Sequence, residues 1–354
     1  MRVFVWALTL TLLQTDASRP AFSDWLTAVR QEALSRGIRQ EIVDAALSGL
    51  DEPMPIILER DRAQAEVVLP LENYLRRILT ARRIRTGRER YADERELLNE
   101  VGQKYGVPPR IIAAIWGVES NFGRFSGVRP TIAALATLAW DPRRATFFRG
   151  ELFDALEILN RGDIDLADMK GSWAGAMGQV QFMPSSYLKF AEDYDGDGRK
   201  DIWSSPGDVF ASIANYLRGH GWTSGEAWGR EVAISSEALR HIHSDVPFRE
   251  GSCRATRDMT VAQPLTKWAG LGVHMPGGKP LPKSDTAASL VSGAKRQFLV
   301  YTNYEALLEY NCAHSYAISV ALLADAIAQG PAEPAKHRPA KANAPGQPGQ
   351  PGQH

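Results

Sequence analysis

The sequence has few cysteines and no excess of either charge. Its 354 residues include two cysteines, and 41 lysines and arginines balance 41 aspartates and glutamates. Two cysteines exclude a disulfide-rich scaffold and a cysteine-rich zinc module. The zero net charge removes the diffuse attraction on which most nucleic-acid-binding proteins depend, so we expect no nucleic-acid partner. With 44% apolar residues, the composition is typical of a globular protein with one large domain or two to three smaller ones.

Long apolar runs are also absent. The run over residues 3–13 covers only about half of the ~30 Å hydrocarbon core of a bilayer, so no membrane span is expected. Its place after Met1 and Arg2, with small residues near Ala17, predicts a cleaved signal peptide over residues 1–18. No cysteine follows it, which favours a soluble over a lipid-anchored protein. A hydrophobic N-terminus of a cytoplasmic protein is the alternative.

In most of the remaining chain, apolar residues recur at the spacing of an α-helix. Apolar spacing predicts two helices between residues 22 and 50 with Gly37 between them, and one long helical stretch from Glu59 to Thr86. Residues 231–297 are short apolar pieces broken by glycine and proline, which predicts a partly β insertion with little regular structure. Helical spacing returns from Tyr304 to Ala328. Residues 331–354, rich in proline, alanine and glycine, predict a disordered tail.

An arginine-rich run ends the predicted long helix. It permits two interpretations, a solvated helix face interleaved with carboxylates or a surface that binds a polyanion. The run consists of Arg76, Arg77, Arg82, Arg83, Arg85, Arg88 and Arg90.

One acidic residue lies on an apolar helix face. The segment "YGVPPRIIAAIWGVESNFG" has prolines suited to a helix start and Gly123 suited to its end. Glu119 follows Ile115 by four residues and precedes Phe122 by three, so it shares their side of the helix. Apolar surroundings and the negative end of the helix dipole both disfavour the ionised form. Such an acid keeps its proton near neutral pH, as a general acid must, although a glutamate that simply reaches water is the alternative.

Five segments in order resemble one known family. They are "AIWGVESNFG" (114–123), "GAMGQVQFMPSSY" (175–187), "DGDGRKDIW" (195–203), "ANYLRGHGW" (214–222) and "YNCAHSYAISV" (310–320). They closely resemble the membrane-bound lytic murein transglycosylase B family, and the resemblance runs from about residue 22 to residue 328. It implies a mainly α (α+β) fold whose lysozyme-like helical core carries a helical N-terminal part and a small insertion.

The residue pattern along the chain predicts the domain bounds, and the resemblance agrees with them. Residues 19–95 form the N-terminal helical domain, and residues 96–230 the lysozyme-like catalytic core with an EF-hand-like loop. The insertion covers residues 231–297. Residues 298–330 complete the core.

Site residues follow from the same resemblance, position by position. Glu119 corresponds to the sole catalytic acid and base. The residues that match substrate-binding positions are Ser120, Arg143, Arg144, Gln181, Phe182, Tyr216, Tyr310, Asn311 and Tyr316.

The implied reaction is non-hydrolytic cleavage of the bond between N-acetylmuramic acid and N-acetylglucosamine, leaving a 1,6-anhydro end. Catalysis needs no cofactor. The partners are peptidoglycan glycan strands in the periplasm, with proteins of cell-wall synthesis or degradation beside them. The alternatives are a muramidase that hydrolyses the same bond, an inactive calcium-stabilised glycan-binding protein, and a polyanion-binding scaffold that uses the arginine run.

The segment "DYDGDGRKDIW" has acidic residues at alternating positions followed by a glycine, like the start of an EF-hand calcium loop. Its twelfth position is Ser204 rather than glutamate, and the family closes the loop with a later acidic residue. We expect a structural calcium ion, with a metal-free hydrogen-bonded loop as the alternative. The expected ligands are Asp193, Asp195, Asp197, the carbonyl of Arg199 and Asp208.

The two cysteines, Cys253 and Cys312, are candidates for a disulfide if the protein is exported to an oxidising compartment. Two buried free thiols are an equally good interpretation.

Overall fold

The structure is a computed structural model that describes residues 20–64 and 69–329. The predicted signal peptide over residues 1–18 and the predicted tail over residues 331–354 lie outside the described residues. Helices dominate the described part, as the sequence predicts, and the mainly α fold is confirmed.

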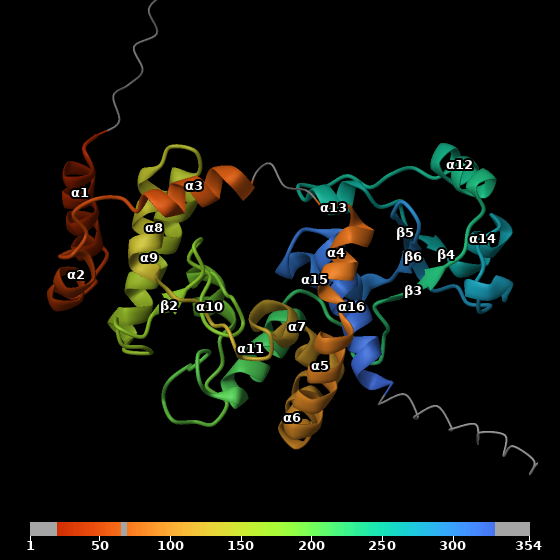
Figure 1. Cartoon of the computed structure of the whole chain (residues 1–354), viewed down its shortest axis with the longest axis horizontal. Coiled ribbons are helices and arrows are strands. Elements are labelled where there is room, and N and C mark those ends of the chain that lie inside the picture. The colour runs from red at the N-terminus through yellow and green to blue at the C-terminus, as the bar shows by residue number, and fades with distance from the viewer. Residues whose placement is uncertain (1–19, 65–68, 330–354) are drawn as a thin grey trace, which may run out of the picture.

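The described residues form sixteen α-helices and six short strands (Figure 1). The helices are α1 (Phe22–Ser35), α2 (Gln40–Leu47), α3 (Pro55–Gln64), α4 (Leu71–Ile78), α5 (Ala81–Asp93), α6 (Arg95–Tyr105), α7 (Pro109–Ser120), α8 (Thr131–Trp140), α9 (Ala145–Arg161), α10 (Pro184–Phe190), α11 (Pro206–Gly219), α12 (Ser236–Asp245), α13 (Arg254–Arg257), α14 (Leu265–Gly270), α15 (Thr302–Tyr310) and α16 (His314–Ala328). The strands are β1 (Arg129–Pro130), β2 (Lys170–Gly171), β3 (Gly229–Val232), β4 (Gln263–Pro264), β5 (Ala287–Ser292) and β6 (Gln297–Val300).

The N-terminal helices differ from the prediction in one respect. The expected pair around Gly37 is present as α1 and α2, but the expected single helix from Glu59 to Thr86 is wrong. That stretch contains α3, α4 and α5. Pro70 cannot continue a helix into α4, and the hydroxyl of Thr80 caps a new helix by accepting the Arg83 N–H at 3.2 Å.

The centre of the molecule is α7. Its residues from Ile111 to Gly117 are all buried, which is the pattern of a helix enclosed on every side. Helices α5, α6, α11 and α16 pack around it, and Figure 1 shows it between the α8–α9 pair and the α4–α16 pair. Helices from distant parts of the sequence therefore surround the element that carries Glu119.

The insertion carries more regular structure than the sequence predicts. Four antiparallel strands in the order β3-β6-β5-β4 form one sheet, which shares a separate small core with α12 and α14. Gly229 pairs with Val300 and Val232 with Gln297. Because β3 and β6 are the two ends of the insertion, their pairing closes it on itself, and both strands extend beyond the expected bounds of residues 231–297.

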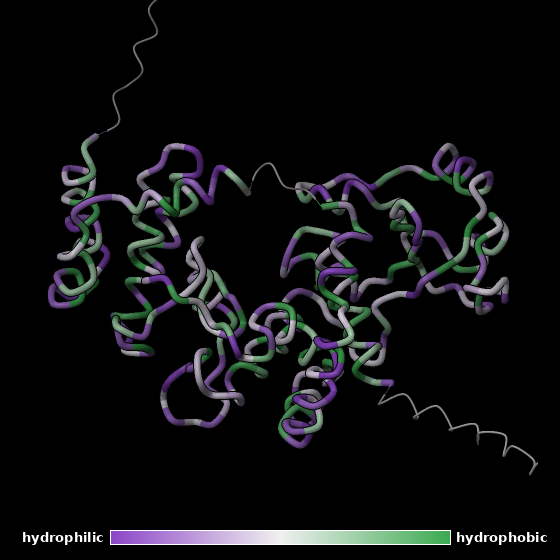
Figure 2. The backbone as a smooth tube through the Cα atoms, in the orientation of Figure 1, coloured by the Kyte–Doolittle hydropathy of each residue, from purple (hydrophilic) through white to green (hydrophobic). Residues whose placement is uncertain are grey.

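Membrane-crossing helices are absent from the described ranges, since none there is both long and apolar enough. Figure 2 shows hydrophilic residues interspersed with hydrophobic ones along the helices.

Candidate active site

Helix α7 ends in an unusual turn. Pro109 occupies its first position, as expected, but the helix stops at Ser120 rather than at Gly123. Asn121, Phe122 and Gly123 then have φ values of 52°, 60° and 77°. A bulky residue such as Phe122 adopts a positive φ only where its surroundings impose it.

Glycines make room for this turn. A Cβ atom on Gly117 would lie 2.5 Å from the Phe122 ring, and one on Gly87 in α5 would lie 2.9 Å from it. Phe122 is therefore locked between two helices. A Cβ atom on Gly123 would lie 2.5 Å from Oε1 of Gln179, the same oxygen that accepts the indole N–H of Trp116 at 2.7 Å. The tight packing fixes the direction in which Glu119 leaves the helix.

Glu119 lines a pocket of about 910 Å³ between α5 and the end of α7. The side chain is half-buried. Loss of hydration raises its pKa to about 7, and the Tyr316 hydroxyl acts in the opposite direction. The sequence-based expectation of an acid that keeps its proton near neutral pH is thus matched by its surroundings. The pocket is lined by Thr80, Arg82, Arg83, Thr86, Arg90, Val118, Glu119, Ser120, Asn121, Phe122, Gly123, Arg124 and Phe125.

Aromatic side chains pack behind Glu119. Tyr316 and Tyr310 are stacked with ring centroids 6.2 Å apart, and burial followed by the charge of Glu119 raises the pKa of both hydroxyls. Tyr310 donates to the Val180 carbonyl at 2.8 Å. This places both tyrosines beside the acid, and the Tyr316 hydroxyl is the one that lowers the pKa of Glu119.

Three residues expected to bind sugar do not line the pocket that contains Glu119. Phe182 is buried and packs on Tyr216 and Tyr310 at centroid distances of 5.3 and 5.8 Å. Tyr216 is buried too and donates to the Glu309 carbonyl at 2.7 Å. The structure thus places Phe182 and Tyr216 in the aromatic core under the site. Asn311 is exposed outside the pocket that holds Glu119.

The side chains of Ser120 and Gln181 form hydrogen bonds with backbone groups. The Ser120 hydroxyl donates to the Trp116 carbonyl at 2.9 Å and accepts the Gly123 N–H at 3.0 Å. Gln181 has a φ of 54° and donates through Nε2 to the Gly178 carbonyl at 2.8 Å. Ser120 therefore holds the turn that aims Glu119.

The paired arginines line a second pocket of about 450 Å³ rather than the one that contains Glu119. Both arginines donate hydrogen bonds to the carboxylate of Asp61 in α3, whose side chain is 5% exposed. Arg143 donates through Nε at 2.8 Å, and Arg144 donates through Nη2 at 2.6 Å. Burial raises the pKa of Asp61, but the two guanidinium groups outweigh it and the net shift is downward. Exposed Phe147 lies on the same pocket.

Sequence reasoning missed Tyr74, Arg82 and Arg83 as neighbours of the acid. The pKa of Tyr74 is raised by burial and then by the charge of Glu119, and the two arginines line its pocket. All three fall between Glu59 and Thr86, where the sequence predicts one long helical stretch. Only the break between α4 and α5, signalled by Thr80, brings them to the site.

The acidic loop brings three of its expected ligands together. One carboxylate oxygen each from Asp193, Asp195 and Asp197 lies within 4.8 Å of the others. Asp193 also accepts the N–H groups of Gly196 at 2.8 Å and Gly198 at 2.9 Å, which curls the loop around it. Three converging hard oxygen donors of like charge fit a cation of the calcium type.

The other two expected ligands are placed differently. Asp208 is fully buried and accepts the backbone N–H groups of Tyr194 and Asp201, both at 2.7 Å, so it ties the two ends of the loop together. Burial is the main cause that raises its pKa to about 6. Arg199 is exposed, and its own N–H donates to Asp197 at 2.8 Å.

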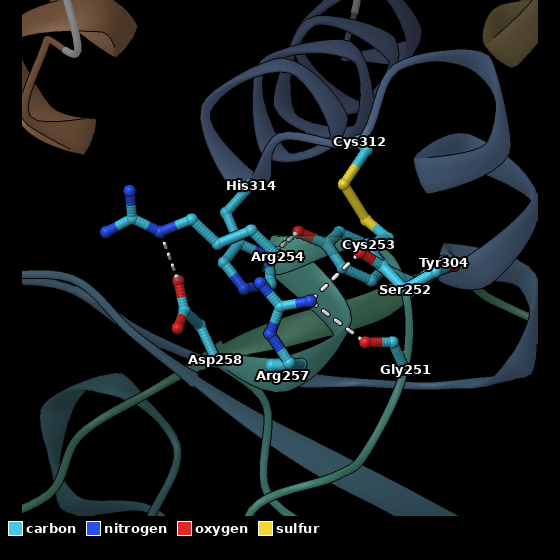
Figure 3. The surroundings of a disulfide bond; sticks show 9 residues. All are labelled: Gly251, Ser252, Cys253, Arg254, Arg257, Asp258, Tyr304, Cys312 and His314. Atoms are coloured by element: carbon cyan, nitrogen blue, oxygen red, sulfur yellow. Dashed lines mark hydrogen bonds and ion pairs between the residues drawn. A yellow bond between two sulfur atoms is a disulfide. The ribbon is translucent and has the colours of Figure 1, made fainter. Parts of the chain in front are cut away.

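Cys253 and Cys312 are joined by a disulfide, with Cα atoms 5.9 Å apart (Figure 3). Cys253 immediately precedes α13, and Cys312 lies in the short link between α15 and α16. Beneath the bond, the Tyr304 hydroxyl lies 2.9 Å from Nδ1 of His314. The bond therefore fastens the insertion to the segment that carries Tyr310 and Tyr316.

The chain is similar to known proteins both in sequence and in structure. Residues 21–325 match the family described as the transglycosylase SLT domain. Over 154 residues the chain is 43% identical to the membrane-bound lytic murein transglycosylase B of Escherichia coli (strain K12). That match covers 43% of this chain and 42% of the relative, less than half of its length.

Solved structures match over more of the chain. SltB3 from Pseudomonas aeruginosa, solved in complex with NAG-NAM-pentapeptide, is 41% identical with a TM-score of 0.80, covering 88% of this chain and 80% of that one. The Escherichia coli lytic transglycosylase Slt35, solved in complex with calcium, is 29% identical with a TM-score of 0.70, covering 89% of this chain and 95% of that one.

Proposed function

Because the chain belongs to the transglycosylase SLT domain family, we propose that it is a lytic transglycosylase that cleaves peptidoglycan glycan strands between N-acetylmuramic acid and N-acetylglucosamine. The observation that carries the proposal is Glu119. Among the described residues it is the only carboxyl group lining its pocket, and burial raises its pKa to about 7. A group with that pKa donates a proton at neutral pH and accepts it again.

The reaction needs only this one carboxyl group. Glu119 protonates the glycosidic oxygen, and the acetamido oxygen of the muramyl sugar relieves the positive charge at the anomeric carbon as the bond breaks. Glu119, now ionised, takes the proton of the muramyl 6-hydroxyl, whose oxygen attacks the same carbon. A 1,6-anhydro ring forms as the acetamido oxygen leaves the anomeric carbon, Glu119 is again in its protonated form, and no water is consumed. The rigid turn after α7 keeps the carboxyl group in place for both transfers.

Replacing the acid by its amide tests the proposal. We expect Glu119→Gln to fold and to lose about 10²- to 10⁴-fold of its rate on purified sacculi, the range typical of a general acid–base group. Glu157→Gln, on α9 outside both pockets, is the matched control. Mass analysis of the products also decides between elimination and hydrolysis, since a muramidase product is heavier by one water. Substantial turnover by Glu119→Gln would remove this residue from the mechanism.

We further propose that the acidic loop binds a structural calcium ion through Asp193, Asp195 and Asp197. The convergence of their oxygens within 4.8 Å supports this. The ion would neutralise three like charges and hold the loop that leads into α11. Millimolar calcium should raise the melting temperature of the protein, and Asp195→Asn should abolish the rise. Asp285→Asn, an exposed aspartate in the insertion, should leave it intact. A melting temperature indifferent to calcium would refute the site.

We propose a periplasmic location for the enzyme, where its substrate lies. The disulfide supports this, because such bonds persist in oxidising compartments. Export in cells followed by N-terminal sequencing tests both the location and the predicted cleavage near residue 18, and a lipid-modified mature terminus would contradict the expectation of a soluble form.

A further inference from the structure

The pocket that holds Glu119 is strongly cationic. Arg82, Arg83 and Arg90 reach it from α5, and Arg124 reaches it from the turn after α7. Against these four guanidinium groups, the described lining contributes one carboxyl group, that of Glu119. The field inside the pocket therefore favours a ligand that carries negative charge.

Most of these arginines have no carboxylate partner among the residues that the structure describes. Arg90 lies 3.6 Å from Asp93. Within residues 20–64 and 69–329, no ion pair involves Arg82, Arg83 or Arg124: Arg83 donates only a long hydrogen bond of 3.4 Å to the Ile78 carbonyl, and Arg124 lies over the Phe125 ring. By contrast, Arg296 forms an ion pair with Glu231 at 2.6 Å. The charge in the pocket is thus left available.

Two further features favour an anion at this place. Arg83 is half-buried, and the loss of hydration lowers its pKa, so an incoming anion would offset a solvation cost that the protein alone bears. The pocket also includes the first turn of α5, from Thr80 to Arg83. The N-terminal end of a helix adds partial positive charge to the same region.

The seven-arginine run is not one continuous binding surface. Only Arg82, Arg83 and Arg90 line the pocket, whereas Arg88 donates to the Ala326 carbonyl at 2.9 Å and Arg76 bonds to Asn73. An extended polyanion would need an unbroken face. A compact anionic group held beside Glu119 fits the arrangement better.

We propose that Arg82, Arg83 and Arg124 form a subsite that binds a carboxylate of the substrate next to the bond under attack. The inference rests on the proposed function and deepens it. The amino-sugar backbone of the glycan is neutral, so the charge must come from its side groups. Guanidinium groups bind carboxylates in a forked geometry. Two sources offer that chemistry: the carboxylates of an attached stem peptide, and the lactyl carboxylate that is freed when the stem is removed.

Kinetics on three matched substrates test the subsite. The substrates are soluble glycan strands with intact stem peptides, the same strands after amidase treatment has exposed the lactyl carboxylates, and strands whose carboxylates have been converted to methylamides. The enzymes are the wild type, Arg82→Gln/Arg124→Gln, and Arg85→Gln as the control, since Arg85 lies on the same helix outside the pocket. Thermal melts confirm that each variant folds.

We expect the double variant to raise KM about tenfold on the carboxylate-bearing strands, the loss of roughly one charge-assisted hydrogen bond. Its kcat should not change, and on methylamide strands it should match the wild type. Arg85→Gln should behave as wild type throughout. The carboxylated strand that shows the effect identifies the source of the anion.

Two outcomes would overturn the inference. One is an equal loss on charged and neutralised strands, and the other is no loss on any strand. Both leave the proposed function standing, because the wild type still cleaves. If the wild type cleaved none of the three kinds of strand, the proposed function itself would be refuted.

Discussion

Tyr316 is buried, and its hydroxyl lies near the carboxyl group of Glu119. Loss of hydration raises the pKa of Glu119, and this contact lowers it, so that the balance falls at about 7. Tyr316 comes from α16 and Glu119 from the last turn of α7, and these two helices pack directly on each other. The proton affinity of the acid is therefore set by a contact between segments almost two hundred residues apart in the sequence.

Tyr316→Phe should move the pH dependence of the reaction upward. Without the hydroxyl, only burial acts on Glu119, and its pKa rises above 7. Since the protonated form starts the reaction, the alkaline limb of the kcat/KM profile should shift to higher pH. Tyr301→Phe is the control, because Tyr301 is a buried tyrosine that bonds Arg230 in the insertion. An alkaline limb that stays in place or moves downward would contradict the assigned contact.

The local part of the site was predictable from the sequence. The start of α7 at a proline and the place of Glu119 on its apolar side follow from residue spacing alone. The resemblance placed Tyr310 and Tyr316, which the structure brings beside Glu119. Such features depend on helix geometry or on matching motifs, both of which can be read from short segments.

The non-local part was not predictable. Tyr74 and Arg83 reach the site only because α4 and α5 are separate helices, and helical spacing continues through the stretch that divides them. Phe182 matches a sugar-contacting position, yet it is buried against Tyr216. Whether an aromatic ring faces a cleft or the core beneath it depends on packing between helices, which spacing within one segment does not encode.

Removing the disulfide should lower stability. Cys253 and Cys312 are 59 residues apart, and closing a loop of that length contributes about 4 kcal/mol to the free energy of unfolding in the chain-entropy model. Urea unfolding of Cys253→Ser/Cys312→Ser should show a deficit of this order against the oxidised wild type. Reductant should lower the wild type to the same level and leave the variant unchanged. Equal stability of the oxidised wild type, the reduced wild type and the double variant would show that the bond does not form or does not constrain the unfolded chain.

The ionisation of Glu119 should lower the free energy of unfolding of the protein at high pH. Its pKa is about 7 when folded and about 4.3 in an unfolded chain. A folded-state pKa above the unfolded value means that the stabilising contribution is complete below pH 4 and is lost as the pH rises to 7. The full difference is about 4 kcal/mol.

Glu119→Gln removes this titration and should therefore unfold at a higher urea concentration than the wild type above pH 7. Because most of the titration lies between pH 5 and pH 8, the gap in unfolding free energy should widen by about 2.5 kcal/mol between those two values. Glu157→Gln is the control for the loss of one negative charge, since Glu157 lies outside both pockets. A gap independent of pH would mean that Glu119 ionises as freely in the folded protein as in water, and the acid would then lack the property on which the proposed reaction depends.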